Sequence, residues 1–401
     1  MTMIEDTLLS RLGSFSLLQK NREKIKKSIK KSRRKRKIRT YKTADPLPGN
    51  EIKKLVKQLQ ENTFNFHPYF PKEIIKNNRA DENQPEKRYR GLSIPSPRDR
   101  VVHKTMLHIL LPKFLPYIRQ TPSYGVLKKH GVKEAVKDDQ TLIWTDHKYL
   151  LIADIQRFFN KIDKDLLTKK VLTQLDDRSL DRLIKETIHA KYKTTPKNEV
   201  LFPGKEIGIP QGCALSPLFS DVYLKEFDLK MTNSGYKIFR YIDDFIIPCK
   251  TKRQRYFAYM RAKKILKIMK LNLDAYGKDK CKTTEISESP VFLGFQLGLN
   301  KHIAPDPKKY FKFKRKIGQM ISDLPQQRDR WPEIIKEINF IIPGWCGAYS
   351  ICNRAVLKLY YDELNTCVTE NVEKLKDKKK LSDHDARFLR HTIKKFGFVV
   401  T

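Results

Sequence analysis

The spacing of apolar residues alternates between the periods of helix and strand along most of the chain. A helical period predicts amphipathic helices at 51–61, 100–117, 163–175, 214–230 and 252–270. Short apolar runs bounded by polar residues predict strands at 149–155, on both sides of 243–244, and at 290–299. Residues 68–98 are basic and show neither period, so we expect them to be rich in loops.

Two of these helices have a clear inner face. In 214–230, Phe219, Tyr223 and Phe227 recur every four residues, and Ser216-Pro217 reads as an N-cap followed by proline at the first helical position. In 252–270, Ala258, Ala262, Ile265 and Met269 share one face. The order of elements favours a mixed domain in which helices cover a small antiparallel sheet.

The last hundred residues lose strand character and become helical and basic, which indicates a separate subdomain. We therefore predict an α+β fold in three parts: a basic N-terminal extension at 1–49, a central domain at 50–300 and a helical region at 301–401.

The stretch FRYIDDFIIP at 239–248 sets two carboxylates, Asp243 and Asp244, inside a run that is otherwise suited to a buried strand. Asp154 ends another predicted strand. Three close carboxylates repel one another unless a cation lies between them. Two Mg²⁺ ions about 3.5–4 Å apart satisfy such a site and suit in-line attack on a phosphate, and Mn²⁺ could substitute. The alternative is a hairpin tip with solvated aspartates.

Charge points to a polyanionic partner. The net charge is +38, from 83 Lys and Arg against 45 Asp and Glu. Residues 20–42 hold fourteen basic residues and one acid, Glu23. This segment is either a solvated tail or an arm that lies along phosphates in a salt-sensitive, sequence-independent manner. In the second interpretation the nucleic-acid contacts come from Lys31, Arg33, Arg34, Lys35, Arg36 and Lys37.

The sequence argues against a membrane-spanning, secreted, zinc-binding or disulfide-stabilised protein. No apolar run is long enough to span a membrane, and the N-terminus lacks the apolar core of a secretory signal. The six cysteines are scattered without a CxxC pair, which argues against a zinc site or a disulfide framework. We expect a protein of the bacterial cytoplasm.

Six motifs in order resemble those of reverse transcriptases, most closely the bacterial and group II intron branch. They are RGLSIPSPRDRVV at 90–102, SYGV at 123–126, Asp154 in LLIADIQRFFNKID, GIPQGCALSPLFSD at 208–221, and YIDD at 241–244 with FLGF at 292–295. The resemblance covers roughly residues 85–300 and implies a right-hand polymerase: fingers, a ferredoxin-like palm, and a helical thumb.

The resemblance also implies roles for single residues. Asp154 and Asp243 would bind the metals, with Asp244 in support and the Ile155 carbonyl completing one site. Arg90, and with less support Arg88, would pair with nucleotide phosphates. Gln211 and Gly212 would line the nucleotide pocket, where glycine lets the backbone approach closely.

Three further residues concern the nucleotide. Phe159 lies where the family places a ring beneath the sugar, which would favour dNTPs over NTPs; core packing is the alternative, because Phe158 could take either role. Lys280 and Lys282 compete for the family's lysine near the leaving pyrophosphate. We take Lys282, and the spacing does not decide between them. Each could instead be an ordinary solvated lysine.

No RNase H-like domain, zinc-bearing endonuclease or integrase is recognisable after residue 300. The thumb also lacks the Val-Thr-Gly usual in retron enzymes. By elimination the chain resembles the bacterial group tied to phage defence and abortive infection. We expect an RNA-directed DNA polymerase that copies a dedicated noncoding RNA. Its partners would be that RNA, the DNA product and dNTPs, with a further copy or a partner protein possible. The alternatives are template-independent or protein-primed DNA synthesis on the same fold, and a maturase-like RNA-binding scaffold.

Overall fold

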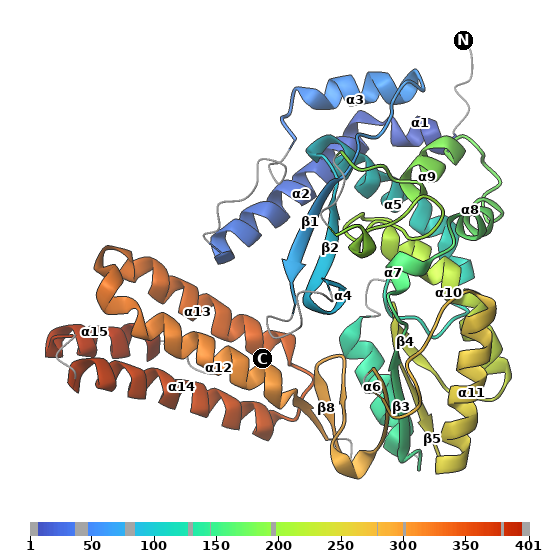
Figure 1. Cartoon of the computed structure of the whole chain (residues 1–401). Coiled ribbons are helices and arrows are strands. Elements are labelled where there is room, and N and C mark those ends of the chain that lie inside the picture. The colour runs from blue at the N-terminus through green and yellow to red at the C-terminus, as the bar shows by residue number, and fades with distance from the viewer. Residues whose placement is uncertain are drawn as a thin grey trace. The chain divides into compact units, whose positions relative to one another are not determined.

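A computed structural model describes residues 7–36, 47–76, 85–126, 131–144, 146–193, 198–278, 280–299, 302–377 and 381–394. The chain divides into two compact units. The first contains residues up to 135 together with 151–283, and the second contains 136–150 together with 284 onward. Figure 1 labels their elements. The division into 1–49, 50–300 and 301–401 stays a prediction.

The first unit combines many helices with two small sheets. Its helices include α1 (Leu8–Leu12), α2 (Phe15–Arg36), α3 (Glu51–Gln60), α4 (Pro85–Arg88), α5 (Pro97–Ile118), α7 (Phe158–Lys161), α8 (Lys164–Leu172), α9 (Asp181–Ile188), α10 (Ser216–Asn233) and α11 (Lys252–Ile268). One sheet pairs β1 (Phe70–Ile75) with β2 (Tyr89–Ile94). The other has the order β4-β5-β3-β6, formed by Phe239–Tyr241, Asp244–Cys249, Tyr149–Asp154 and Cys281–Glu285. The predicted α+β class is confirmed.

The basic N-terminal region is helical as far as it is described, and α2 is not a solvated tail throughout. Leu18 is fully buried, and the Asn21 side chain donates to Thr105 Oγ1 at 3.2 Å on α5. At the start of α1, the Leu8 amide donates to Asp177 at 2.5 Å. Because α1 and α2 both pack on α5, the N-terminal helices belong to the first unit.

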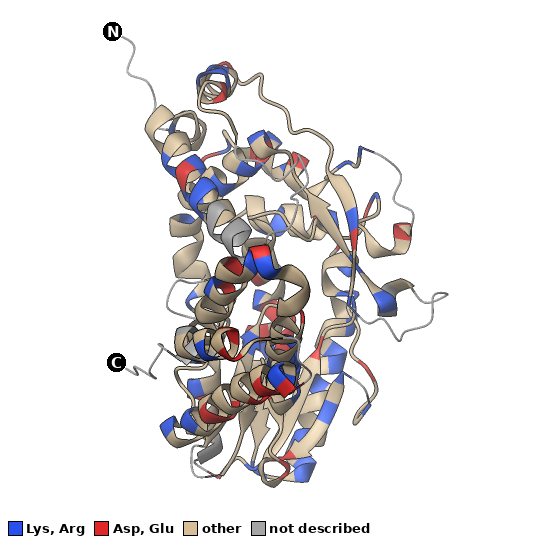
Figure 2. Ribbon diagram, turned by 90° about the vertical axis from the view of Figure 1, so that its left-hand side faces the viewer, with Lys and Arg blue, Asp and Glu red and all other residues tan. Residues whose placement is uncertain are grey.

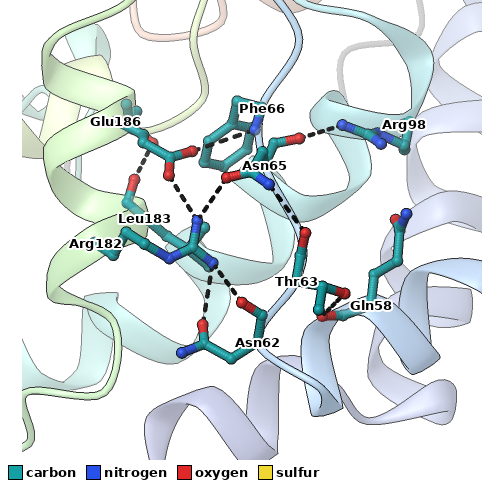
Figure 3. A network of polar contacts seen from close by, with 10 residues as sticks. Gln58, Asn62, Thr63, Asn65, Phe66, Arg98, Arg182, Leu183 and Glu186 are labelled. Atoms are coloured by element: carbon teal, nitrogen blue, oxygen red, sulfur yellow. Dashed lines mark hydrogen bonds and ion pairs between the residues drawn. The ribbon is translucent and has the colours of Figure 1, made fainter.

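A polar network joins α9 to the segment between α3 and β1 (Figure 3). The Arg182 guanidinium donates to the Asn62 carbonyl at 3.2 Å, to Asn65 Oδ1 at 3.1 Å and to Glu186 at 2.6 Å. Glu186 in turn accepts from the Phe66 amide at 3.3 Å. Arg98 of α5 donates to the Asn65 carbonyl. These contacts fix the chain as it enters β1.

Helix α10 confirms one expectation and corrects another. Phe219, Tyr223 and Phe227 are all buried, as their spacing predicts. Ser216 is not the N-cap, because the cap position belongs to Leu215. The Ser216 hydroxyl donates instead to the Pro210 carbonyl at 2.7 Å and so ties the helix to the loop before it.

The expectation of loops at 68–98 is wrong in part. β1 and β2 form an antiparallel pair in which Phe70 faces Ile94 and Ile75 faces Tyr89. The exposure of β1 does not alternate, and the buried positions of β2 are Gly91 and Ser93 rather than large apolar residues. This pair therefore lacks the period-2 hydrophobic signal on which strand prediction depends.

The second unit is a helical bundle with a three-stranded antiparallel sheet. The sheet contains β7 (Val291–Phe292), β8 (Phe295–Leu297) and β9 (Ile303–Pro305). The strand expected at 290–299 is therefore a hairpin with a turn at Leu293-Gly294, where both residues have positive φ. The helices are α12 (Pro307–Ser322), α13 (Trp331–Ala348), α14 (Arg354–Asp377) and α15 (Asp383–Lys394), and α6 (Val132–Trp144) contributes its later residues.

A separate hydrophobic core holds this bundle together, with Ile317, Ile338, Leu364 and Leu389 fully buried. Trp345 packs against that core and stacks on Phe313, with ring centroids 5.5 Å apart.

Charge is spread widely over the ribbon, where Lys and Arg (blue) occur on many helices and strands (Figure 2). None of the helices in the described part of the chain is long and apolar enough to cross a membrane. The six cysteines are free.

Candidate active site

The two adjacent aspartates lie on a tight hairpin between β4 and β5. Tyr241 pairs with Asp244, which leaves Ile242 and Asp243 as the two turn residues. Ile242 has φ of 61°, a left-handed conformation that is strongly unfavourable for a β-branched residue. Such strain persists only where surrounding structure enforces it.

A buried arginine supports this turn. Arg240 is fully buried, and its Nη1 donates to the Ile242 carbonyl at 2.8 Å. The same guanidinium forms ion pairs with Asp228 at 2.5 Å and with Asp221 at 3.2 Å, both on α10. Burial by itself lowers the pKa of Arg240, but the two carboxylates outweigh this effect and raise the pKa. Arg240 is therefore charged and its guanidinium is held in one orientation.

The SYGV segment covers the same turn. The Tyr124 amide donates to the Arg240 carbonyl at 2.8 Å, and the Ser123 hydroxyl donates to Asp221 at 2.6 Å. A Cβ at Gly125 would lie 2.9 Å from Ile242 Cγ1. Glycine is needed here because Ile242 of the hairpin approaches so closely.

Backbone hydrogen bonds bring Asp154 to the hairpin. The Ile155 amide donates to the Asp243 carbonyl at 3.1 Å, and the Asp154 amide donates to the Lys280 carbonyl at 3.0 Å. Burial, followed by the charges of Asp154 and Asp244, raises the pKa of Asp243 to about 7. The three carboxylates thus form one electrostatic cluster, as expected from sequence.

The donor set fits a divalent cation. One oxygen of Asp154, Oδ1, is buried without a hydrogen-bond partner, and the other forms an ion pair with Lys280. Within the described ranges, no three His, Cys, Asp or Glu side chains are grouped closely enough to hold a metal by themselves. Mg²⁺ commonly binds one or two protein carboxylates and takes its remaining oxygens from water and substrate phosphates. Asp154 and Asp243, beside the Ile155 backbone, satisfy that requirement.

A cleft of about 330 Å³ opens over these carboxylates, within the range typical of ligand sites. It brings together Asp154, Asp243, Asp244, Arg90, Phe159 and Gln211, which the sequence singled out. Lys76, Arg157, Asn160, Val200, Leu201 and Lys280 also line it.

Strand register separates the two candidate lysines. Lys280 lies beside Asp154 and lines the cleft, whereas Lys282 does not. In β6, Lys282 lies two residues further along the strand, which is roughly 7 Å further from Asp154. The choice of Lys282 is therefore corrected to Lys280.

Gly212 is also corrected, because it does not line the cleft. Its φ is 127°, and a Cβ there would lie 2.5 Å from the Ser93 carbonyl oxygen of β2. The Ser93 amide donates to the Gln211 carbonyl at 2.7 Å. Gly212 therefore allows the Gln211 loop to pack against β2, while the Gln211 amide reaches the cleft and donates to Asn160 at 3.3 Å.

Arg88 does not line the cleft either; its guanidinium lies 5.5 Å from the centre of the Tyr89 ring. Lys76 takes a place in the cleft that sequence reasoning missed. The Lys76 amide donates to the Arg88 carbonyl at 2.9 Å, which continues the pairing of β1 with β2 and sets Lys76 at its end. Because this pairing was not predicted, no signal in the sequence marked Lys76.

Sequence reasoning also missed the segment Glu199–Leu201, which forms one wall of the cleft through Val200 and Leu201. Arg157 and Asn160 both donate to the Val200 carbonyl, at 2.7 and 3.3 Å. Gly91 of β2 lies so close that a Cβ would come within 2.3 Å of the Leu201 carbonyl oxygen. Glycine at position 91 is the one local sign of this contact.

The two adjacent phenylalanines have different surroundings. Phe158 is buried and packs against Tyr223, with ring centroids 6.3 Å apart. Both phenylalanines line the cleft, but only Phe159 is partly exposed there. Of the two rings, Phe159 is the one available to a bound molecule.

The proposed basic arm is described only in part. The backbone of Lys31 and of Arg33–Arg36 lies in α2, and their side chains lie outside the description. Lys37 lies outside the described residues altogether. Their contact with nucleic acid stays a prediction.

Curated proteins of similar sequence include Protein YkfC of Escherichia coli K12. It is 25% identical over 282 residues, which cover 60% of this chain and 68% of YkfC. The group II intron-encoded protein LtrA of Lactococcus lactis subsp. cremoris is 25% identical over 186 residues. This match covers 46% of the chain but only 29% of LtrA.

Among solved structures, apo telomerase from Candida tropicalis aligns with a TM-score of 0.44 and 12% identity. The alignment covers 82% of this chain and 61% of the telomerase chain. The family model described as reverse transcriptase (RNA-dependent DNA polymerase) matches residues 74–297, more than half of the chain and all of the cleft described above. The chain belongs to the reverse transcriptase family, and its homologues include group II intron-encoded and bacterial proteins.

Proposed function

We propose that this protein is an RNA-directed DNA polymerase that extends a primer 3′-hydroxyl with dNTPs, using two Mg²⁺ ions, for which Mn²⁺ can substitute. One observation carries the proposal. Asp154 and the Asp243–Asp244 hairpin converge in a cleft whose other walls carry cations, Arg90 and Lys76, and an aromatic ring, Phe159. Carboxylates opposite cations suit a triphosphate bridged to the protein through metal ions.

The three carboxylates have different proposed roles, which follow from their positions. Asp154 and Asp243 bind the ions, because backbone hydrogen bonds fix their strands side by side. Asp244, the most exposed of the three, supports them. When bound, the ions lower the pKa of the attacking hydroxyl and neutralise phosphate charge. Lys280, now paired with Asp154, can release this carboxylate and pair with the departing pyrophosphate.

The remaining cleft residues orient the nucleotide. Arg90 can grip the phosphates with its planar guanidinium, and Lys76 adds a second positive charge. Gln211 and Asn160 hold each other by a hydrogen bond, so their amides approach the base or sugar from fixed directions.

The carboxylates supply the direct test. Asp154→Asn and Asp243→Asn should each lower primer extension on an RNA template by about a hundredfold or more, because several kcal/mol of charge stabilisation are lost. Asp165→Asn is the matched control, since Asp165 is 92% exposed and outside the cleft. Undiminished DNA synthesis by folded Asp243→Asn protein would overturn the proposal.

Phe159 tests the choice of sugar. In this proposal the Phe159 ring lies beneath the sugar and would clash with a 2′-hydroxyl, so Phe159→Ala should raise NTP incorporation relative to dNTP incorporation. The measurement is the ratio of kcat/KM for the two nucleotides. A ratio equal to that of the wild type would assign Phe159 to core packing.

We further propose a dedicated noncoding RNA as template and a role in antiphage defence, which the sequence resemblance supports. Sequencing the nucleic acid that copurifies with the protein should recover one recurrent structured RNA and its DNA copy. DNA products unrelated to any bound RNA would favour template-independent or protein-primed synthesis. A defence phenotype that survives Asp243→Asn would favour a maturase-like scaffold.

A further inference from the structure

Helix α11 presents a second apolar face that the fold does not use. Its inner side is buried and packs against β5 and α10. Large apolar side chains also lie on its outer side and are 44–67% exposed: Tyr256, Phe257, Met260 and Ile268. We call this side the α11 outer face.

The same face is strongly basic. Helix α11 contains seven Lys and Arg residues and no acid. The exposed ones are Lys252, Arg253, Arg261, Lys263, Lys264 and Lys267. Among the residues that the structure describes, no carboxylate forms an ion pair with Lys263, Lys264 or Lys267. Helix α3 differs, because Lys54 pairs with Glu51 at 3.1 Å and Lys57 with Glu61 at 3.8 Å. The positive charge of the α11 outer face thus lacks the intrahelical compensation seen in α3.

The aromatic rings are held in fixed orientations. Tyr256 makes edge-to-face contacts with Phe257 and with Tyr276, at centroid distances of 5.9 and 5.4 Å. Arg255 donates to the Tyr276 hydroxyl at 3.1 Å, and the Arg253 guanidinium lies 5.7 Å from the Phe257 ring centre. Tyr256 and Phe257 nevertheless remain 46% and 49% exposed, so part of each ring surface stays open for a base to stack.

This face is separate from the polymerase cleft. β5 runs from Asp244 at the cleft to Cys249, roughly 17 Å away, so the start of α11 lies at the far end of that strand. No residue of α11 lines the cleft.

We propose that the α11 outer face binds single-stranded RNA at a site outside the cleft. Aromatic platforms flanked by Lys and Arg are a means by which proteins hold single strands: bases stack on the rings while cations follow the phosphates. The choice of RNA rests on the proposed function, in which the template enters the reaction as RNA and the DNA product leaves paired with it. A protein partner that buried these rings would have to neutralise the surrounding lysines as well.

The first experiment maps the contact directly. A 20-nucleotide single-stranded RNA containing 4-thiouridine is crosslinked by ultraviolet light to the full chain carrying Asp243→Asn, and the adducts are located by mass spectrometry. Crosslinks within residues 252–268 are expected. Crosslinks found elsewhere with none in 252–268 would overturn the proposal.

The second experiment measures affinity. Tyr256→Ala with Phe257→Ala should weaken binding of the same RNA about tenfold, through loss of stacking. Replacing Lys263, Lys264 and Lys267 with Gln should reduce the slope of log K against log salt by about 2. Extension of a short pre-annealed primer–template should keep its rate in both variants, which separates this site from the polymerase cleft.

The matched control replaces Lys53, Lys54 and Lys57 of α3 with Gln, an equal change in charge on a helix that itself contains no aromatic residue. An equal loss of affinity in this control would mean that RNA is attracted by the protein's overall positive charge and not by the α11 outer face. Equal displacement by single-stranded DNA of the same length would overturn the assignment to RNA. A dimer that Tyr256→Ala with Phe257→Ala dissociates, without a change in RNA binding, would assign the face to a second copy of the chain.

Discussion

At the scale of single residues, the candidate site depends on an unfavourable backbone conformation. Ile242 takes a positive φ so that Asp243 can occupy the second turn position of the hairpin. Arg240 binds the Ile242 carbonyl and is itself fixed by Asp221 and Asp228. We interpret Arg240 as a positioning residue for Asp243, although nothing in the run FRYIDDFIIP marks it as more than one polar residue in a strand.

Asp228→Asn should therefore lower the free energy of unfolding by about 3 kcal/mol, because it leaves a buried charge with one fewer partner. At a temperature where the variant is still folded, kcat for primer extension should fall more than the KM for dNTP rises, since the hairpin shifts rather than the cleft wall. Urea unfolding and steady-state kinetics measure the two effects.

Asp181→Asn provides the comparison, because Asp181 pairs with Arg178 at 2.7 Å but the arginine is 58% exposed. An exposed pair contributes at most about 1 kcal/mol. Equal effects of the two substitutions on stability and kcat would contradict the positioning role.

Histidine 103 gives a prediction about pH. It is fully buried, stacked on Phe66 at 4.3 Å, and burial lowers its pKa to about 3. The unfolded chain, with a histidine pKa near 6.5, binds the proton more readily. This residue's contribution to stability is therefore present above pH 6.5 and is progressively lost as the pH falls toward 3.

At pH 5 the loss should be about 2 kcal/mol relative to pH 7. His103→Gln removes this titration, so the difference in unfolding free energy between pH 7 and pH 5 should shrink by that amount. Urea denaturation of both proteins at both pH values measures it. An unchanged difference would show that other groups dominate acid sensitivity.

At the scale of elements, the cleft is formed by segments that meet through close backbone contact. The β1–β2 pair carries Arg90 and leads to Lys76, and Gly91 admits the Leu201 carbonyl. Strand and loop approach one another here without an intervening side chain, which requires glycine at that point.

Gly91→Ala should lower the free energy of unfolding by about 1–3 kcal/mol, because its Cβ overpacks the contact. It should also raise the KM for dNTP, since the wall at Glu199–Leu201 must move. Gly344→Ala in α13 is the control: a Cβ there meets nothing within 4 Å, and alanine favours the helix by up to about 1 kcal/mol. Unchanged stability and KM in Gly91→Ala protein would contradict the close approach of Gly91 to the Leu201 carbonyl.

At the scale of the whole molecule, the net charge of +38 predicts strong dependence of RNA binding on salt. If about six to ten phosphates are neutralised, affinity should fall by about a thousandfold or more between about 50 and 200 mM KCl. Fluorescence anisotropy with a labelled 20-nucleotide RNA measures the slope. Affinity that is independent of salt would argue against phosphate contacts as the main source of binding.

The sequence by itself determined the family, the α+β class, most helices and the three carboxylates that meet in the cleft. Each of these depends on short-range information: apolar period, residue type and the order of compact motifs. It could not determine which side chains share the cleft, because that depends on pairing between distant segments. Lys280 meets Asp154 across 126 positions of sequence, and strand register, not composition, selects it over Lys282.

The tertiary structure also decided the roles of residues whose types are ambiguous. Gly212 packs against Ser93 and does not line the cleft, Phe158 is buried while Phe159 is partly exposed, and Arg240 supports a strained turn. The sequence shows the same residue type whether a glycine, phenylalanine or arginine packs in the interior or takes part in the site. Only the neighbours that folding supplies, through burial and hydrogen bonding, distinguish packing from chemistry.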